Sequence, residues 1–409
     1  MEFTKNFNVI DDDYTKFRDI VSELDKKTHV SEFEMNKAAF LLPANAETKS
    51  GKTAVILFDE QTTAKSPDNI RKINMENLPA ELLLKFKVGY PILVINSKIF
   101  FISEFAMQTL IQVCELGGSA MYENNEFRNK LLAYTFLHTG KNCKIVYREE
   151  EIAGKPVRLI LSVNHMSYGQ IQNSVVCDII EYLQNNGMYG NIEVSHWEVS
   201  QEKTSITVFF PDTAKDLSLV YKLPETFVPG ITIKTSDTAQ LAFTVEGVLK
   251  RKSGVIYPFC EVEKKHTLNF TKEKLISDME KEVFPLFTKI PEKLKEGASI
   301  EVTPKSWDLT NPQKIKENEE KVGDVIASIT KSLSKEFSKK LMNKLAELLA
   351  AEVNGQYYYT MYDIYTLFLN LPERLPELSE VLKKQLAKAV IKIPFVKIKK
   401  EETVSYIAP

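Results

Sequence analysis

The chain has 409 residues, of which 44% are hydrophobic and 26% are charged. Its 53 Lys and Arg residues nearly balance its 55 Asp and Glu residues, so the formal net charge at pH 7 is -2. This composition excludes wholesale disorder, a fibrous repeat protein and a globally basic nucleic-acid coat. A chain of this length predicts two or three domains.

The sequence shows neither a membrane span nor a secretory signal. The most apolar segment, 93–102, is interrupted by the polar residues 96–98, and no run approaches the roughly 18 apolar residues of a spanning helix. Residues 1–6 lack the basic flank and apolar run of a signal peptide. We therefore expect a cytoplasmic protein with no membrane partner.

The four cysteines predict buried thiols. Cys114, Cys143, Cys177 and Cys260 each lie in an apolar segment, and no two of them form a Cys-x-x-Cys pair. A buried free cysteine behaves as a small hydrophobic residue, and a reducing cytosol fits that use. Because a zinc site normally shows paired ligands at short spacing, we expect no metal and no cofactor.

Residues 1–100 predict a mixed α/β segment. Apolar residues recur at helical spacing over 12–24, which predicts a helix. Continuous apolar runs over 53–58 and 90–101 predict buried strands, and Pro67 marks a turn between them.

Residues 101–268 predict a central α+β domain. Ser103 is the expected N-cap of a helix, and a second helix is expected over 124–138. Strands over 143–148 and 157–163, joined by a charged tip, predict a hairpin, and a helix follows over 170–185. Further strands are expected over 192–199, 205–210, 217–223, 231–235, 241–249 and 255–262. Their connections are too short for crossover helices, so we expect an antiparallel meander.

Residues 269–409 predict an all-helical C-terminal region. One helix is expected over 272–287, with Pro285 near its end, and a loop over 291–312. From Val322 to Leu348 apolar residues recur every three or four positions, which is typical of an amphipathic helix. Two more helices are expected over 357–371 and 375–391. The complete pattern predicts an α+β fold with a central antiparallel sheet, packed helices and a helical C-terminal region.

Two short motifs match catalytic signatures only in part. Gly51, Lys52 and Thr53 resemble the end of a P-loop, but Ala46 replaces the required glycine and a strand follows where a helix should begin. His196 and Glu198 have the spacing of a zinc deaminase motif without its partner Pro-Cys-x-x-Cys. The sequence therefore does not support an enzyme, although a carboxylate site assembled from distant residues stays open.

Local groups of basic residues are candidates for binding a polyanion. One group lies at 250–252 and another at 264–265, each after a predicted strand, so they are expected to converge on one edge of the meander. Residues 381–400 contain seven Lys and no acid, which is also typical of a solvated helix face. Five tyrosines between 357 and 365 either stack on bases or pack within the helices, and their helical spacing favours packing.

The order of features between residues 105 and 260 provides a further comparison. A helical pair precedes a hairpin with a second strand over 157–162, followed by Tyr168, a helix and the segment 229–238. This order resembles the phage/plasmid-like protein family, a domain of unknown function in bacteriophages and integrated elements. Arg251 and Cys260 fit the Arg and Cys of that family, whereas Ala239 and the residues after Cys260 depart from its pattern. The resemblance implies a phage or mobile-element origin and a role beside recombination or anti-restriction functions.

Together these observations predict a phage-type protein of the host cytoplasm that binds or anneals single-stranded nucleic acid as a homo-oligomer. Only seven of the basic residues are Arg, so lysine contacts to the phosphate backbone are favoured over base reading. The expected contact residues are Lys250, Arg251, Lys252, Lys264, Lys265, Arg158, Lys397, Lys399 and Lys400.

Two alternatives stay open. The first is a virion or host-takeover structural protein that acts by self-assembly or protein–protein binding, supported by the near-neutral charge and the long amphipathic segment 322–353. The second is an enzyme, which would need a deep pocket with converging Asp or Glu side chains.

Overall fold

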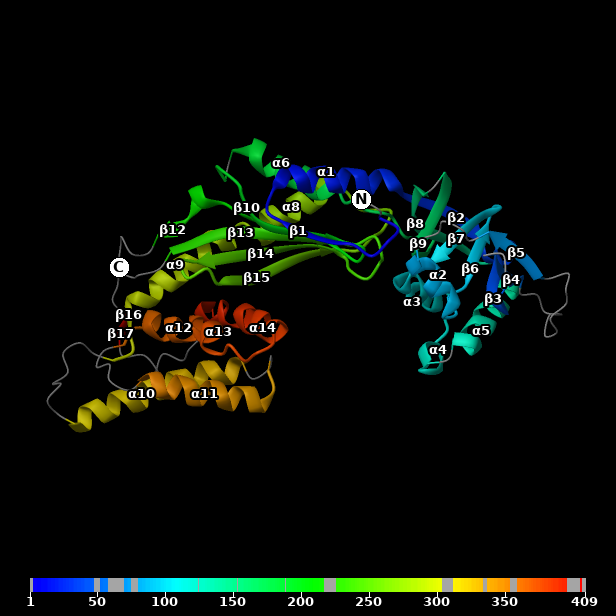
Figure 1. Cartoon of the computed structure of the whole chain (residues 1–409). Helices are drawn as coiled ribbons and strands as arrows, with labels where there is room; N and C mark the ends of the chain where they lie inside the picture. Colours follow the sequence, from blue (N-terminus) through cyan, green and yellow to red (C-terminus); the bar gives the residue numbers. More distant parts are fainter. Residues whose placement is uncertain are drawn as a thin grey trace.

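The computed structural model describes residues 3–47, 52–57, 70–74, 80–123, 125–152, 154–187, 189–216, 226–303, 312–333, 337–353, 359–395 and 405–406. Within these residues the chain forms two β-sheets at opposite ends of an elongated molecule, with a helical C-terminal layer below the first sheet (Figure 1). The predicted α+β fold, antiparallel sheet and helical C-terminal region are confirmed.

The first sheet, sheet A, is antiparallel throughout. Among the described residues its strand order is β1-β10-β11-β13-β14-β15, with β12 beside β13. The predicted meander is confirmed, and the N-terminal strand β1 adds an edge to it. The expected strand 217–223 lies outside the described residues. The strands are β1 (Asn8–Asp11), β10 (Glu193–Ser200), β11 (Thr204–Phe209), β12 (Lys215–Asp216), β13 (Thr226–Thr235), β14 (Phe243–Arg251) and β15 (Ile256–Lys264).

Three helices cover one face of sheet A: α1 (Tyr14–Lys27), α6 (Val175–Asn186) and α8 (Lys272–Glu282) (Figure 1). Strand side chains alternate between the two faces, so one row across the sheet is buried beneath these helices: Trp197, Ile206, Ile233, Val245 and Val262. Trp197 also donates from Nε1 to the Asp13 carbonyl at 2.9 Å. This contact fixes the start of α1, because Asp13 is its N-cap.

The second sheet, sheet B, is mixed, because β7 and β9 pair in parallel. Its order among the described residues is β2-β8-β9-β7-β6-β3-β4-β5. The strands are β2 (Thr28–Glu34), β3 (Ala39–Glu47), β4 (Lys52–Leu57), β5 (Ile70–Asn74), β6 (Ile92–Ile95), β7 (Lys98–Ile102), β8 (Asn142–Ile152) and β9 (Lys155–His165). Sheet B thus combines strands from both sides of residue 100, where one expected domain boundary lies.

Four helices accompany sheet B: α2 (Ala80–Lys87), α3 (Glu104–Val113), α4 (Ala120–Glu123) and α5 (Asn125–His138). The Ser103 N-cap is confirmed, since its hydroxyl accepts a hydrogen bond from the Ala106 amide at 3.0 Å. The single strand expected over 90–101 is instead the hairpin β6–β7. Asn96 and Ser97 both have positive φ angles, 50° and 64°, which suit a two-residue hairpin turn.

The C-terminal region consists of α9 (Leu286–Ala298), α10 (Pro312–Leu333), α11 (Lys339–Val353), α12 (Met361–Leu369), α13 (Leu371–Arg374) and α14 (Glu380–Val390), with the small pair β16 (Ile300–Glu301) and β17 (Ser405–Tyr406). The loop expected from residue 291 is wrong over its first part, since α9 continues through Pro291 to Ala298. Phe287, Ile290 and Leu294 are buried along α9, and their burial outweighs the backbone hydrogen bond that proline cannot make. No helix within the described ranges is long and apolar enough to span a bilayer.

The apolar stripe of residues 322–348 lies on two helices rather than one. The helices α10 and α11 pack against each other below α12–α14 (Figure 1). The stripe residues Val322, Val325, Ile329, Leu333 and Leu345 are all buried in the largest hydrophobic cluster of the chain. This stripe is therefore covered by the chain itself and does not support self-assembly.

Most of the smaller packing expectations are also met. Tyr359, Tyr362 and Tyr365 are buried, which confirms packing over base stacking for these three residues; the other two tyrosines of the group lie outside the described residues. All four cysteines are free thiols, and all but the half-buried Cys260 are buried.

The Leu333→Asp variant tests the α10–α11 packing. An unpaired carboxylate at this buried position should lower the free energy of unfolding by about 3 kcal/mol or more, measured by urea unfolding. The control is Lys340→Asp on α11, where the side chain is exposed, and it should change stability by less than about 1 kcal/mol. Equal midpoints for the two variants would contradict the packing.

Candidate functional site

The basic residues expected to form one positive track lie apart in the fold. Lys250 pairs with Ile256 across the β14–β15 hairpin and Lys264 pairs with Phe243, so the two groups lie at opposite ends of the hairpin. The expected convergence fails because an antiparallel hairpin reverses the chain between one strand end and the next. Lys397, Lys399 and Lys400 lie outside the described residues.

Several of these basic side chains are already paired with carboxylates. The Arg158 Nε donates to Glu149 Oε2 at 2.6 Å, within the hairpin of sheet B. Lys264 forms an ion pair with Asp278 of α8. Such pairs leave little uncompensated positive charge for a phosphate chain.

The remaining four residues differ in their surroundings. Arg251 is buried and donates from Nη1 to Asn370 Oδ1 at 2.8 Å, where it joins sheet A to α12 and α13. Lys250 lies over an aromatic ring. Lys252 is exposed, and so is Lys265 of the other group; no carboxylate among the described residues pairs with either. Nucleic-acid binding therefore stays a prediction, with these two lysines as its exposed cations.

A buried ionic contact joins the two sheets. Arg148 of β8 and Asp237, which follows β13, approach to 3.3 Å between Nη2 and Oδ2, and each side chain is 2% exposed. The Asn173 Nδ2 donates to Asp237 Oδ2 at 2.8 Å and to Asp25 Oδ1 of α1 at 3.1 Å. Burial lowers the pKa of Arg148, and the nearby Asp237 charge opposes that shift. The contact therefore holds sheet A, sheet B, α1 and the start of α6 together.

The Asp237→Asn variant tests this contact. It leaves the Arg148 charge buried without its counter-charge, so we expect a loss of about 3 kcal/mol in unfolding free energy. The control Glu320→Gln removes an exposed ion pair with Lys316 and should cost less than about 1 kcal/mol. The double variant Arg148→Met with Asp237→Leu should regain much of the loss, because it removes both buried charges. Equal unfolding curves for Asp237→Asn and its control would contradict the assignment.

A stacked tyrosine–histidine pair, in which Tyr168 is buried and His266 is half-buried, lies close to this contact. The Tyr168 hydroxyl and His266 Nδ1 are 3.4 Å apart, and the two rings stack with centroids 5.6 Å apart. Both line a cavity of about 240 Å³ together with Asn164 and His165. Burial lowers the pKa of His266, although the Asp237 charge opposes the shift. The tyrosine that belongs to the family resemblance is Tyr168. In this fold its ring stacks on His266 and lines the cavity.

The pH dependence of stability should report on His266. Its folded pKa is below the ordinary 6.5, so below that pH the unfolded chain binds more protons and the free energy of unfolding falls as the pH falls. His266→Phe should flatten this part of the curve between neutral pH and about pH 5, measured by urea unfolding. His196→Gln, on the exposed side of β10, is the control; a wild-type slope in His266→Phe would contradict the prediction.

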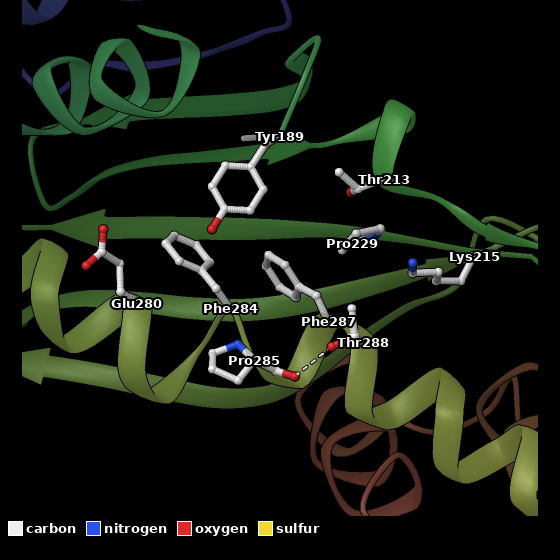
Figure 2. A pocket seen from close by; sticks show the side chains of 9 residues that line it. All are labelled: Tyr189, Thr213, Lys215, Pro229, Glu280, Phe284, Pro285, Phe287 and Thr288. Carbon is white, nitrogen blue, oxygen red and sulfur yellow. Dashed lines mark hydrogen bonds between the residues drawn. The ribbon is translucent and has the colours of Figure 1, made fainter. Parts of the chain in front are cut away.

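A cavity with largely apolar walls, which we call the aromatic pocket, lies between sheet A and the α8–α9 junction (Figure 2). Its volume is about 580 Å³. The apolar lining residues are Tyr189, Pro229, Phe284, Pro285 and Phe287. Sequence analysis missed this pocket because its walls come from segments almost 100 residues apart, none of which carries a recognisable motif.

The pocket walls are held by packed rings. The Tyr189 and Phe284 centroids are 4.9 Å apart, and those of Phe284 and Phe287 are 5.6 Å apart. Gly190 has a φ of +65°, and a Cβ there would lie 2.3 Å from Asp212 Oδ2. The backbone therefore needs glycine next to Tyr189.

Four polar residues complete the lining: Thr213, Lys215, Glu280 and Thr288. The Thr213 and Thr288 hydroxyls donate to the carbonyls of Phe210 and Pro285. In Figure 2, Lys215 and Glu280 lie on opposite sides of the rings. The Glu280 Oε1 accepts a hydrogen bond from the Tyr182 hydroxyl at 3.0 Å. The pocket thus combines an apolar centre with one cation and one carboxylate at its rim.

A second, more polar cleft lies where the end of sheet A meets α2 and α3. It has a volume of about 330 Å³, and its lining includes Glu104, Glu198 and Glu202. The Glu198 carboxylate forms an ion pair with Lys203 at 2.8 Å. In the part of the chain that the structure describes, no three His, Cys, Asp or Glu side chains form a group suited to a metal ion.

The helix α5 carries apolar side chains on both of its faces. Phe136 is buried against the rings of Phe33 and Phe40 in sheet B. On the outer face Tyr134 is 52% exposed, and Tyr122 of the neighbouring α4 is 59% exposed. Phe127 and Leu137 are also exposed there. The high share of apolar residues over 127–137 could have indicated this surface from the sequence. A helix with one buried face needs only one apolar stripe, so the additional apolar residues must lie on another face.

The chain matches no protein-family model, no curated protein and no solved structure. The aromatic pocket and the outer face of α4 and α5 are therefore interpreted from their own chemistry.

Proposed function

We propose that this protein works by self-assembly through the outer face of α4 and α5, as a structural or host-takeover protein. The observation that carries this proposal is the set of exposed apolar side chains on these two neighbouring helices, Tyr122, Phe127, Tyr134 and Leu137; the surface they occupy is called the α4–α5 face. Exposed apolar clusters mark protein–protein contacts, and tyrosine and phenylalanine are enriched at their centres.

The geometry of the α4–α5 face suits a second copy of the same chain. Glu126 and Lys130 form an exposed ion pair at 2.7 Å, one helical turn apart in α5. A two-fold contact needs a feature and its complement on the same surface. When two α5 helices pack antiparallel, Glu126 of each copy can meet Lys130 of the other while the aromatic side chains are buried between them.

Rigid support below the face favours assembly further. The inner side of α5 is anchored by Leu132, Ala133 and Phe136, all buried in the core of sheet B. The outer side chains are therefore presented on a packed element, which lowers the entropy cost of ordering them on association.

The Tyr134→Glu variant tests self-assembly by size-exclusion chromatography with light scattering. The wild-type chain should reach a mass near twice its 46.7 kDa, and the variant should dimerise about tenfold more weakly or worse. The control is Leu268→Glu, at a residue that is 66% exposed between β15 and α8, and it should dimerise like the wild type. A wild-type chain that stays monomeric at its highest soluble concentration would refute the proposal.

The same experiment separates assembly from nucleic-acid binding, the second candidate, which the exposed Lys252 and Lys265 favour. Adding a single-stranded oligonucleotide should leave the mass unchanged if the α4–α5 face alone drives assembly. Backbone binding would instead raise the mass in a way that weakens steeply with salt, and Lys252→Glu with Lys265→Glu would abolish that increase.

A further inference from the structure

We propose that the aromatic pocket binds a small molecule with an aromatic or aliphatic body and a single anionic group. The proposal is independent of the α4–α5 face, because the pocket lies on sheet A, away from α4 and α5 (Figures 1 and 2).

The apolar part of the ligand follows from the size and walls of the pocket. Its volume of about 580 Å³ falls within the roughly 300–1,000 Å³ of small-molecule sites. The Tyr189 ring packs on Phe210 as well as on Phe284, with centroids 4.9 Å apart in both cases. Because the walls are fixed by these contacts, a ligand enters a preformed site and little ordering opposes binding.

The anionic part of the ligand follows from Lys215, the one cation in the described lining of the pocket. The Lys215 ammonium is exposed at the rim and pairs with no described carboxylate. Tyr189 is 7% exposed, and burial raises its pKa to about 12, so the hydroxyl stays protonated. Its hydroxyl also has no hydrogen-bond partner in the described part of the chain. An ammonium beside an apolar wall suits a carboxylate or a phosphate. The Tyr189 hydroxyl points toward the Glu280 side of the rings (Figure 2), so Lys215 alone provides the positive charge.

Glu280 limits the ligand to one anionic group. Its carboxylate lies on the side of the rings away from Lys215 (Figure 2). The Tyr182 hydroxyl already donates to it, and no described Lys or Arg pairs with it. A second anionic group at this end would meet a like charge, so a dianion should bind more weakly than a monoanion of the same size.

The test is isothermal titration calorimetry of the full chain with three probes that share a phenyl body and have similar size: phenylpropionate, phenylpropionamide and phenylpropylamine. The wild type should bind the anion most tightly. Lys215→Glu should weaken binding of the anion by roughly fivefold, the effect of one exposed ion pair. The same variant should bind the amine more tightly than the wild type does. This reversal of preference is not expected from a variant that merely misfolds.

Two further variants complete the test. Lys155→Glu makes the same charge change at an exposed position of β9, far from the pocket, and should keep the wild-type preference. Phe284→Ala removes one wall of the pocket and should weaken the binding of all three probes. The proposal would be overturned if none of the three probes bound to the wild type. It would also be overturned if the wild type and Lys215→Glu each bound the anion and the amine with equal affinity.

Discussion

The contact between Arg148 and Asp237 is the constraint on which the rest of the structure depends. Both charges are removed from water, and a buried charge without a partner costs several kcal/mol. Asn173 links the contact to Asp25 on α1, so two sheets and two helices must keep their relative positions for the Arg148–Asp237 pair to form. The contact thereby sets the geometry at the junction between the two ends of the molecule.

The path of the N-terminal segment reinforces this junction. It contributes β1 to sheet A, then α1, and then β2 to sheet B. Close to the junction, Glu150 of β8 accepts hydrogen bonds from the Thr4 amide and hydroxyl and from Lys27 of α1. The first 34 residues therefore join the two sheets, and a division of the chain near residue 100 would separate strands that share one hydrogen-bonded sheet.

The distribution of charge explains why assembly is the better-supported proposal. Of the nine basic residues singled out from the sequence, Arg158 and Lys264 pair with carboxylates once the chain folds, and Arg251 is buried and bonded to Asn370. Apolar side chains, in contrast, remain exposed on α5 although its other face is already buried. A near-neutral surface with one such face favours association between protein chains over attraction to a polyanion.

The sequence alone determined the features that depend on neighbouring residues. The Ser103 cap, the helix near residues 12–24 and the antiparallel meander follow from local hydrogen bonds and side-chain periodicity, and all are present. Local signals were insufficient where tertiary packing competes with them: the buried stripe of α9 continues through Pro291, and the turn at Asn96 divides one apolar run into two strands. Only the tertiary structure decided where Lys250 and Lys264 lie relative to each other, and which distant residues surround the aromatic pocket. The physical reason is that charge pairing and cavity shape depend on contacts between residues far apart in the chain, which no periodic pattern encodes.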